Sequence, residues 1–418
     1  MININECIRN RKEAVIAFKK RGLSTELLDD LIALENKRKK GQKEIEVLQV
    51  KRNQLTQSIR KNPQEAGSQK EGVKIIKQQI VHLEEIQNEI EKQLKKISLR
   101  IPNFPEKDVH EGQSEKENKI IYSSPDKQKI TEQKPHWEID KASRLLDFKR
   151  GVKLSGSRFY VMYGEFAQLQ RALIQYLLKT LQEAGFLEVT LPYMVHQDAL
   201  LAAGQLPKFA ENLYHDIEED FWWIPTAEVP LTALHQDEIL EADSLPKLYC
   251  AHTACFRREK ASAGKDGRGM KRGHQFDKVE MFSFCKPDQA EGIFNKMVDI
   301  AKKICTELEL PYQLKSLCTG DLGFAASKTI DVEVWAAGCQ EWLEVSSISM
   351  CRDFQSRRAK VRYREGKEKA LCDTLNGSCL GIPRTMIALI ENNQQKDNSI
   401  LVPEPLQPWT GFKKIQVN

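Results

Sequence analysis

The feature that most constrains this chain is the segment 27–100, which contains no aromatic residue and is dense in Lys, Glu and Gln. Its seam residues recur at alternating steps of three and four, the spacing of heptad positions a and d. The first seam is Leu31, Leu34, Arg38, Gly41, Ile45, Leu48, Arg52, Leu55 and Ile59, and the second is Val73, Ile76, Ile80, Leu83, Gln87, Ile90, Leu94 and Ile97. The break KNPQEAGSQKEG, with Pro63, Gly67 and Gly72, separates them. We therefore expect helices of about 35 and 28 residues packed antiparallel in an arm about 50 Å long.

The surface of this predicted arm is basic. Residues 27–100 hold sixteen Lys or Arg against eleven Asp or Glu, with the densest cluster, KRKK, at 37–40. Arg38, Gly41 and Arg52 should weaken the seam. Two interpretations stay open for the charge: a solvated coiled-coil face, or a rod that lies along a phosphate backbone. The net charge of the whole chain is only +5, so any nucleic-acid contact must come from such local patches.

The remainder of the chain predicts an α+β domain. A polar linker, 103–150, carries Pro105, Pro125 and Pro135, and a compact domain over 151–418 follows it. Helical periodicity spans 166–185 and ends at Gly185, and FLEVTLPYMV follows as a strand with Pro192 at an edge or bulge. Further strands are expected at 221–225, 247–256, 279–284, 330–335 and 342–349, with helices at 288–309 and 382–394. Because no β-α-β rhythm occurs, we expect an antiparallel sheet flanked by helices.

Cysteine use and hydropathy narrow the class of protein. The ten cysteines include no C-x-x-C pair, which favours reduced thiols in a cytoplasmic protein and gives no reason to expect zinc. The N-terminus is charged within its first dozen residues, unlike a secretory signal. No apolar run of 18 residues occurs, so we expect no membrane span.

Carboxylates interrupt apolar segments of the second domain. Glu228 lies between Ala227 and Val229, Glu280 follows Val279, and Glu344 begins the run EVSS. A buried carboxylate is costly unless it is paired or binds a metal, and one alone would be a structural ion pair. Three on separate predicted strands favour a polar pocket that grips an ammonium group or a divalent cation. Glu344 with Ser347 would suit magnesium better than zinc.

The segment RREKASAGKDGRGMKRGHQFDK, 257–278, connects two predicted strands and holds eight Lys or Arg and four glycines. A loop this long is either functional or a solvated, mobile connection. Arg257 and Arg258 at its start could bind a phosphate in bidentate fashion. Phe276 at its end could stack on a base. Arg384, at the start of an apolar helix, offers a second cation for a polyphosphate, or else a salt bridge at the start of the helix.

Five segments, in order, resemble the active-site segments of bacterial seryl-tRNA synthetases: TAEVPLT, FRREKASAGKDGRGMKRGHQFDKVE, TGDLGFAASKTIDVEVW, EVSS and NGSCLGIPRTMIALIEN. GFLEVTLP resembles the first motif of class II synthetases, which in that family lies at the dimer interface. The resemblance covers essentially the whole chain, because the family also carries an N-terminal coiled-coil arm. It implies a tRNA-binding domain over 1–102, the linker 103–150, and a class II catalytic domain over 151–418.

The resemblance also implies roles for individual residues. Thr226, Ala227 and Glu228 would hold the amino group of L-serine, and Glu280 and Ser378 would complete the serine pocket. Arg257 would bind the α-phosphate of ATP, beside Arg258, and Glu259 would lie near the adenine or the incoming tRNA end; Arg257, Glu259 and Arg384 would be catalytic. Phe276 would stack on adenine, with Arg384 on the other side. Glu344, Val345, Ser346 and Ser347 would contact ATP, and Glu344 and Ser347 would hold Mg²⁺.

The implied reaction is attachment of serine to tRNA(Ser) through a seryl-adenylate, in a cytoplasmic homodimer whose arm contacts the long variable arm of the tRNA. Charging of tRNA(Sec) stays open. The chain departs from the usual family pattern at Arg258, Lys260, Cys379 and Pro383, which could change ATP affinity. Three alternatives are a carrier-protein ligase, which would lack a long arm, a non-catalytic RNA-binding paralogue, and a coiled-coil scaffold. The intact arm and the retained charged residues argue against them.

Overall fold

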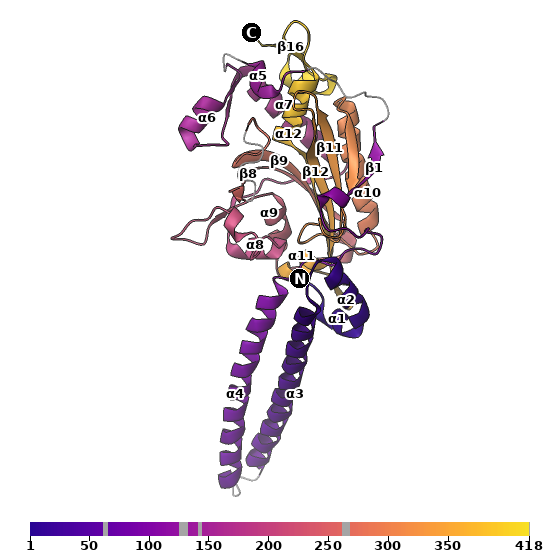
Figure 1. The fold of residues 1–418 in the computed structure, drawn as a ribbon. Coiled ribbons are helices and arrows are strands. Elements are labelled where there is room, and N and C mark those ends of the chain that lie inside the picture. Colours follow the sequence, from indigo (N-terminus) through magenta and orange to yellow (C-terminus); the bar gives the residue numbers. More distant parts are fainter. Residues whose placement is uncertain (62–65, 125–132, 141–143, 261–267, 418) are drawn as a thin grey trace. The chain divides into compact units, whose positions relative to one another are not determined.

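The structure, a computed structural model, describes residues 1–61, 66–124, 133–140, 144–260 and 268–417 (Figure 1). The chain forms two compact units, residues 2–101 and residues 102–418, the second also including Met1. The predicted break at Pro63, the linker residue Pro125 and the middle of the long loop, 261–267, lie outside the described residues. Across the described ranges, no helix is both long enough and apolar enough to cross a membrane.

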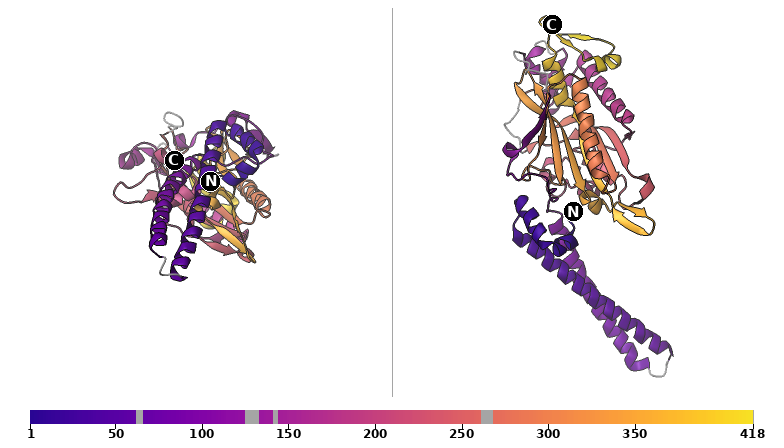
Figure 2. Two further views of the ribbon diagram at one scale, coloured as in Figure 1. Left: turned by 90° about the horizontal axis from the view of Figure 1, so that it is seen from below. Right: turned by 90° about the vertical axis from the view of Figure 1, so that its right-hand side faces the viewer.

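The first unit is helical, with α1 (Ile4–Arg9), α2 (Arg11–Lys20), α3 (Thr25–Lys61) and α4 (Ala66–Ser98). Helices α3 and α4, of 37 and 33 residues, lie side by side and antiparallel (Figure 2). All residues of both predicted seams are buried or half-buried, which confirms the heptad assignment. The prediction of Gly67 and Gly72 as helix breakers is wrong, because both lie within α4. A helical glycine costs only about 1 kcal/mol relative to alanine, which packing along a long seam can offset.

Polar seam residues are matched across the two helices. Arg38 donates hydrogen bonds of 2.8 and 2.9 Å to the buried carboxylate of Glu35. Gln87, from α4, donates to the carbonyl oxygen of Arg38 at 3.2 Å. A Cβ atom at Gly41 would lie 2.8 Å from Oε1 of Gln87, so glycine leaves room for this side chain. The seam at Arg38 and Gly41 is therefore a polar layer in which Oε1 of Gln87 is buried without a hydrogen-bond partner among the described residues. Such a layer specifies helix register at a cost in stability.

The second unit is built on an eight-stranded sheet in the order β1-β10-β11-β12-β15-β9-β8-β4. All neighbouring pairs are antiparallel except β4 and β8. The strands are β1 (Lys119–Ser123), β10 (Tyr312–Ser316), β11 (Lys328–Ala336), β12 (Glu341–Arg352), β15 (Asp373–Gly381), β9 (Gln275–Cys285), β8 (Lys247–Phe256) and β4 (Leu187–Glu188). The predicted antiparallel sheet flanked by helices is confirmed.

Side-chain alternation divides each central strand between two environments. Val279 and Met281 of β9 belong to the main core, which also contains residues of α7 (Gly164–Glu183), α10 (Ala290–Glu307) and α12 (Ile382–Asn392). On the other face, Phe282 and Phe284 of β9 pack with Leu231 of α9 (Glu228–Ala233). The same face lies near α8 (Gln197–Ala203) and α11 (Phe354–Ala359) (Figure 1). Since successive side chains point to opposite faces, each strand can carry polar groups on one face over an apolar core.

The remaining elements are short. They are α5 (His136–Ile139), β2 (Leu146–Asp147), α6 (Phe148–Ser155), β3 (Val161–Met162), β5 (Met194–Val195), β6 (Trp222–Trp223), β7 (Ile239–Glu241), β13 (Arg362–Glu365), β14 (Glu368–Leu371), β16 (Ser399–Leu401), α13 (Gln407–Thr410) and β17 (Lys414–Gln416).

Several predicted boundaries are corrected. FLEVTLPYMV contains only the two-residue strands β4 and β5, since Pro192 lacks the N–H that a continuous ladder needs. The strand expected at 221–225 is only β6. Glu228 begins helix α9 instead of interrupting a strand. Gly185, with φ of +88°, follows the end of α7 as predicted.

A buried hydrogen-bonded cluster joins distant segments of the second unit. Nδ1 of His136 donates to Oε1 of Glu391 at 2.7 Å, and Nε2 accepts from the backbone N–H of Met270 at 3.0 Å, an assignment that follows from the partners. The backbone N–H groups of Gly338 and Cys339 donate to the other oxygen of Glu391, both at 2.9 Å. His136, Cys339 and Glu391 lie close enough to hold a metal ion. Because both ring nitrogens already have partners, we interpret the cluster as structural.

Replacement of His136 by alanine should lower the free energy of unfolding by about 3 kcal/mol, because a buried carboxylate loses a donor and the N–H of Met270 loses its acceptor. Urea denaturation at pH 7 measures this. The control is His110→Ala, since the His110 ring makes an exposed hydrogen bond of 3.0 Å with the carbonyl of Glu117. This substitution should change the free energy of unfolding by less than about 0.5 kcal/mol. Equal effects of the two substitutions would contradict the structural role of the cluster.

Candidate active site

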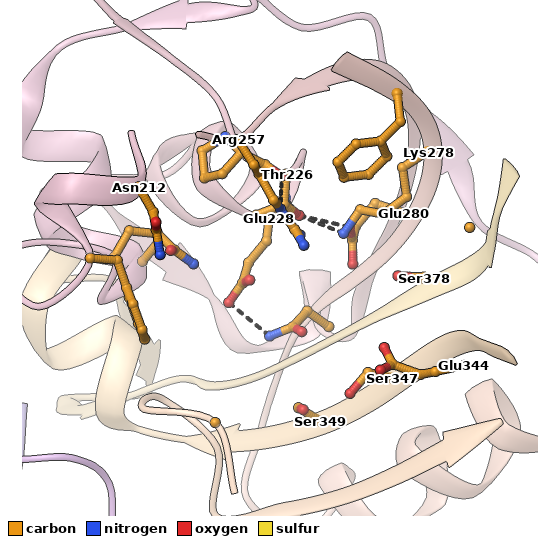
Figure 3. A pocket seen from close by; sticks show the side chains of 18 of the residues that line it. Asn212, Thr226, Glu228, Arg257, Lys278, Glu280, Glu344, Ser347, Ser349 and Ser378 are labelled. Carbon is orange, nitrogen blue, oxygen red and sulfur yellow. Dashed lines mark hydrogen bonds and ion pairs between the residues drawn. The ribbon is translucent and has the colours of Figure 1, made fainter. Parts of the chain in front are cut away.

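The second unit contains a cavity of about 690 Å³ on the sheet face opposite α7, α10 and α12 (Figure 3). Its floor comes from alternate residues of three adjacent strands. Lys278 and Glu280 come from β9, Ser378 from β15, and Ser347 from β12. Its walls include the start of α9, the described ends of the loop 257–278, and the start of α12. The long loop is thus part of a pocket rather than only a solvated connection.

One corner of the cavity is a buried triad of polar side chains. Thr226 Oγ1 donates to Oε2 of Glu280 at 2.9 Å. Lys278 Nζ donates to Thr226 Oγ1 at 2.7 Å and forms an ion pair with Glu280. Figure 3 shows these groups turned toward one another. The charge of Glu280 is therefore already balanced inside the protein, while Thr226 is oriented by both neighbours.

Glu228 occupies a different electrostatic position. Its Oε1 accepts hydrogen bonds from Gln355 Nε2 at 2.6 Å and from Asn376 Nδ2 at 3.0 Å, both neutral amides. Burial, together with the nearby charge of Glu280, raises the pKa of Glu228 to about 7. Because its hydrogen-bond donors carry no charge, this carboxylate is the better site for a ligand's ammonium group.

The cavity lining also carries cations and an aromatic ring. The guanidinium of Arg257 lies 5.1 Å from the centre of the Phe276 ring, and its Nε donates to the carbonyl of Pro225 at 3.2 Å. Glu259, with φ of +49°, has its Oε2 3.5 Å from Nη1 of Arg272. At the start of α12, Arg384 Nη1 donates to the carbonyl of Glu344 at 2.8 Å. Positive groups and an aromatic face thus line the same cavity as the carboxylates, as a nucleotide requires.

A β-bulge places Glu344 and Ser347 on one face of β12. In the pairing with β11, Ser347 is opposite Asp331, Ser346 opposite Val332, and Glu344 opposite Glu333. Val345 is therefore an extra residue without a partner on β11. As a result, the side chains of Glu344 and Ser347, three positions apart, lie on the same face of the sheet. Glu344 is half exposed to the cavity, and Ser346 instead donates to the carbonyl of Ser378 at 2.6 Å.

The oxygen donors around Ser347 fit a hard divalent cation. Glu344 offers a carboxylate and Ser347 a hydroxyl. Within the part of the chain that the structure describes, Oδ1 of neighbouring Asp331 is buried without a hydrogen-bond partner. Burial and the nearby charge of Glu344 raise the pKa of Asp331 to about 8. An all-oxygen donor set of this kind is suited to Mg²⁺.

The cavity brings together most of the predicted site residues. Lining it are Thr226, Glu228, Arg257, Glu259, Phe276, Glu280, Glu344, Val345, Ser347, Ser378 and Arg384. Ala227, Arg258 and Ser346 are absent from the lining: Ala227 is fully buried, and Arg258 packs over Tyr214 with its Nε bonded to the carbonyl of Leu213. Among the departures, Pro383 lines the cavity, Cys379 is in the core and Lys260 is exposed.

Sequence reasoning missed Lys278, Asn376 and Gln355. A usable signal existed for two of them. Lys278 lies two residues before Glu280, and Asn376 lies two residues before Ser378, so strand periodicity places each pair on one face. Gln355 lies in α11, and only the tertiary fold brings it to Glu228.

Comparison with known proteins matches both units. Residues 1–105 match the family model described as the seryl-tRNA synthetase N-terminal domain, and residues 210–393 match the tRNA synthetase class II core domain (G, H, P, S and T). The serine–tRNA ligase of Dehalococcoides mccartyi is 46% identical over 393 residues, which cover 93% of this chain and 94% of the relative.

Solved structures agree with these matches. The seryl-tRNA synthetase from Pyrococcus horikoshii complexed with ATP superposes with a TM-score of 0.93 at 32% identity, covering both chains fully. The cytoplasmic serine–tRNA ligase from Naegleria fowleri in complex with AMP gives a TM-score of 0.86 at 27% identity, covering 96% of this chain and 94% of the other.

The raised pKa of Glu228 predicts a pH-dependent stability difference. The pKa of Glu228 is higher in the folded protein, about 7, than in the unfolded chain, 4.5, because ionisation is unfavourable in the fold. The free energy of unfolding therefore falls as pH rises from 4.5 through about 7. The free energy of unfolding of Glu228→Gln should therefore exceed that of the wild type by about 3 kcal/mol at pH 8 and by less than about 1 kcal/mol at pH 5. Urea denaturation at both pH values measures the difference. The exposed Glu218→Gln is the control, and an equal gain at both pH values would refute the assignment.

Proposed function

Because the chain belongs to the seryl-tRNA synthetase family, with a class II core, we propose that it attaches L-serine to tRNA(Ser) at the expense of ATP through a seryl-adenylate. The observation that carries this proposal is one cavity whose lining combines carboxylates with cations and an aromatic ring. The carboxylates are Glu228 and Glu280, and the cations and the ring are Arg257, Arg384 and Phe276. An amino acid and a nucleotide that react with one another need this pairing of charges.

Serine recognition is assigned to Glu228 and the polar groups near it. The ammonium group of serine lies against Glu228, whose raised pKa falls once a positive charge neutralises it. The serine hydroxyl then meets the polar groups around Thr226, Glu280 and Ser378. Alanine lacks this hydroxyl and would leave buried polar groups unpaired, so the site should reject it strongly. Threonine has to be excluded by shape, which is weaker.

Activation of serine needs no side-chain nucleophile. The serine carboxylate attacks the α-phosphorus of ATP in line, and the bond to the bridging oxygen breaks as pyrophosphate leaves. Arg257 and Arg384 neutralise charge on the phosphates, while Phe276 stacks on the adenine. Glu344 and Ser347 are the residues that would hold Mg²⁺, which supplies further neutralisation of the phosphate charge.

Transfer to tRNA completes the reaction. A ribose hydroxyl at the tRNA end attacks the adenylate carbonyl, and AMP leaves. We assign tRNA binding to residues 1–102, the linker to 103–150 and catalysis to 151–418. The arm of α3 and α4, with its excess of Lys and Arg, suits the phosphate backbone of the variable arm. Serylation of tRNA(Sec) in a charging assay would identify this RNA as a second substrate.

We also propose a cytoplasmic homodimer. The segment that resembles the first class II motif, 185–192, exposes Leu187 (62%), and Tyr193 (39%) and Met194 (49%), also exposed, follow it directly. Such apolar exposure on adjoining short strands is typical of a subunit interface.

Amino-acid-dependent pyrophosphate exchange, without tRNA, tests the proposed function. We expect exchange with serine, and at least about 100-fold less with alanine or glycine. Exchange with glycine or alanine in place of serine would indicate a carrier-protein ligase. No exchange with any amino acid would indicate an RNA-binding protein that has lost catalysis.

Arg257→Ala should lower serine-dependent exchange by about 100-fold or more, because a preorganised cation that faces the reacting phosphate is lost. The matched substitution is Arg258→Ala, at the neighbouring arginine outside the cavity lining, which should cost less than about tenfold. Thermal unfolding verifies that both variants are folded. Comparable losses in the two variants would contradict the geometry of the site.

Shortening the arm should separate the two steps of the reaction. Replacing residues 43–85 with a short glycine-containing turn keeps the hydrogen bond from Gln87 to the carbonyl of Arg38 that joins the two helices. We expect exchange within about twofold of the intact chain, because the described residues that line the cavity all belong to the second unit, and loss of tRNA serylation by roughly 100-fold. Serylation at the wild-type rate would show that the arm does not bind the tRNA.

A further inference from the structure

We propose that Asp331 is a further carboxylate of the divalent-cation site, acting beside Glu344 and Ser347. This inference rests on the proposed function, since it extends the site assigned there to Mg²⁺. It concerns a residue of β11, the strand next to the one that carries the two donors already assigned.

The strand register places Asp331 next to these donors. Asp331 and Ser347 are directly opposite in the antiparallel pair β11–β12, and opposite residues point to the same face with Cβ atoms about 5 Å apart. Ser347 lines the cavity, so Asp331 lies on the same side of the sheet, next to the lining residues although not one of them. The bulge at Val345 turns Glu344 to this same face.

The second observation is the unfilled hydrogen-bonding capacity of Asp331. In the described portion of the chain, its Oδ1 is buried and has no hydrogen-bond partner, while its carboxyl interacts with the Ser347 hydroxyl. Its charged neighbours are Glu344, Asp321 and Glu333, all acidic. A buried carboxylate that lies among other carboxylates is stabilised when a cation binds to it.

Glu333, two residues along the same strand, is a carboxylate whose two oxygen atoms both have partners within the protein. Gln313 donates to its Oε2 at 2.6 Å, and Lys315 donates to its Oε1 at 2.5 Å. Glu333 therefore already has a cation and needs no metal. Asp331 has no cationic partner among the described residues, and Glu344 is half exposed, with Arg384 Nη1 3.6 Å from its Oε2. With the Ser347 hydroxyl, these two carboxylates form the hard oxygen set that Mg²⁺ and Mn²⁺ prefer.

A purely structural role for Asp331 predicts different behaviour. If the carboxyl served only to hold Ser347, its replacement by asparagine would destabilise the metal-free fold and leave cation affinity unchanged. If it binds the cation, the isosteric amide removes a ligand oxygen while keeping the shape of the side chain. The metal-free protein would then be at least as stable as before, while the cation is held more weakly.

The test is titration of the full chain with Mn²⁺, in the presence of a non-hydrolysable ATP analogue, followed by electron paramagnetic resonance. We expect Asp331→Asn to raise the Kd for Mn²⁺ about tenfold or more. Glu333→Gln, which removes the same charge two residues away, should change it by less than about twofold. Thermal unfolding in EDTA should show Asp331→Asn at or above the wild-type midpoint.

Three results would overturn the proposal: unchanged Mn²⁺ affinity in Asp331→Asn, an equal loss in Glu333→Gln, which would indicate a general effect of charge, or a lower unfolding midpoint without loss of Mn²⁺ affinity. Serine-dependent exchange by the wild type is measured in parallel. If the wild type exchanges serine and Asp331→Asn binds Mn²⁺ normally, only this inference fails, whereas absence of exchange in the wild type removes the proposed function.

Discussion

The alternation of side chains along β9, β12 and β15 is the constraint on which the rest of the second unit depends. Val279, Met281 and Leu375 pack into the core beneath α7, α10 and α12. Their neighbours Lys278, Glu280 and Asn376 face the cavity. The floor of the cavity is thus rigid, because moving any of its polar groups would disturb a close-packed core. A rigid polar floor is what orientation of two substrates requires.

The negative charges in and beside the cavity are only partly balanced in the free protein, and bound ligands would balance the rest. Glu280 is balanced internally by Lys278, whereas Glu228 is held by the neutral amides of Gln355 and Asn376. Asp331 lies among acidic neighbours, next to Ser347 of the lining. The free protein therefore has carboxylates that are costly to ionise, and a bound ammonium group or metal ion relieves that cost. The ammonium group and the metal ion would thus bind at Glu228 and beside Asp331, where the reaction needs positive charge.

The sequence predicted the elements set by periodicity and missed those set by tertiary contact. The heptad steps predicted both arm seams, and the pocket contains most of the residues that the motif resemblance named. The glycines at 67 and 72 were misjudged, since long-range packing overrides a local cost of about 1 kcal/mol. Glu228 was expected on a strand, because IPTAEVPLT is too short and apolar for its period to be read. The bulge at Val345 leaves no signal in one sequence, and without it Glu344 and Ser347 would face opposite sides.

The central claim is that one cavity holds serine and the nucleotide as a single reacting pair. Calorimetric titration with a non-hydrolysable seryl-adenylate analogue, against its alanyl counterpart, tests this most directly. The account predicts one tightly bound seryl analogue per chain and alanyl binding weaker by a factor on the order of 100 or more, because the missing hydroxyl leaves polar groups unpaired. Equal affinity for the two analogues, or no binding of either, would contradict it.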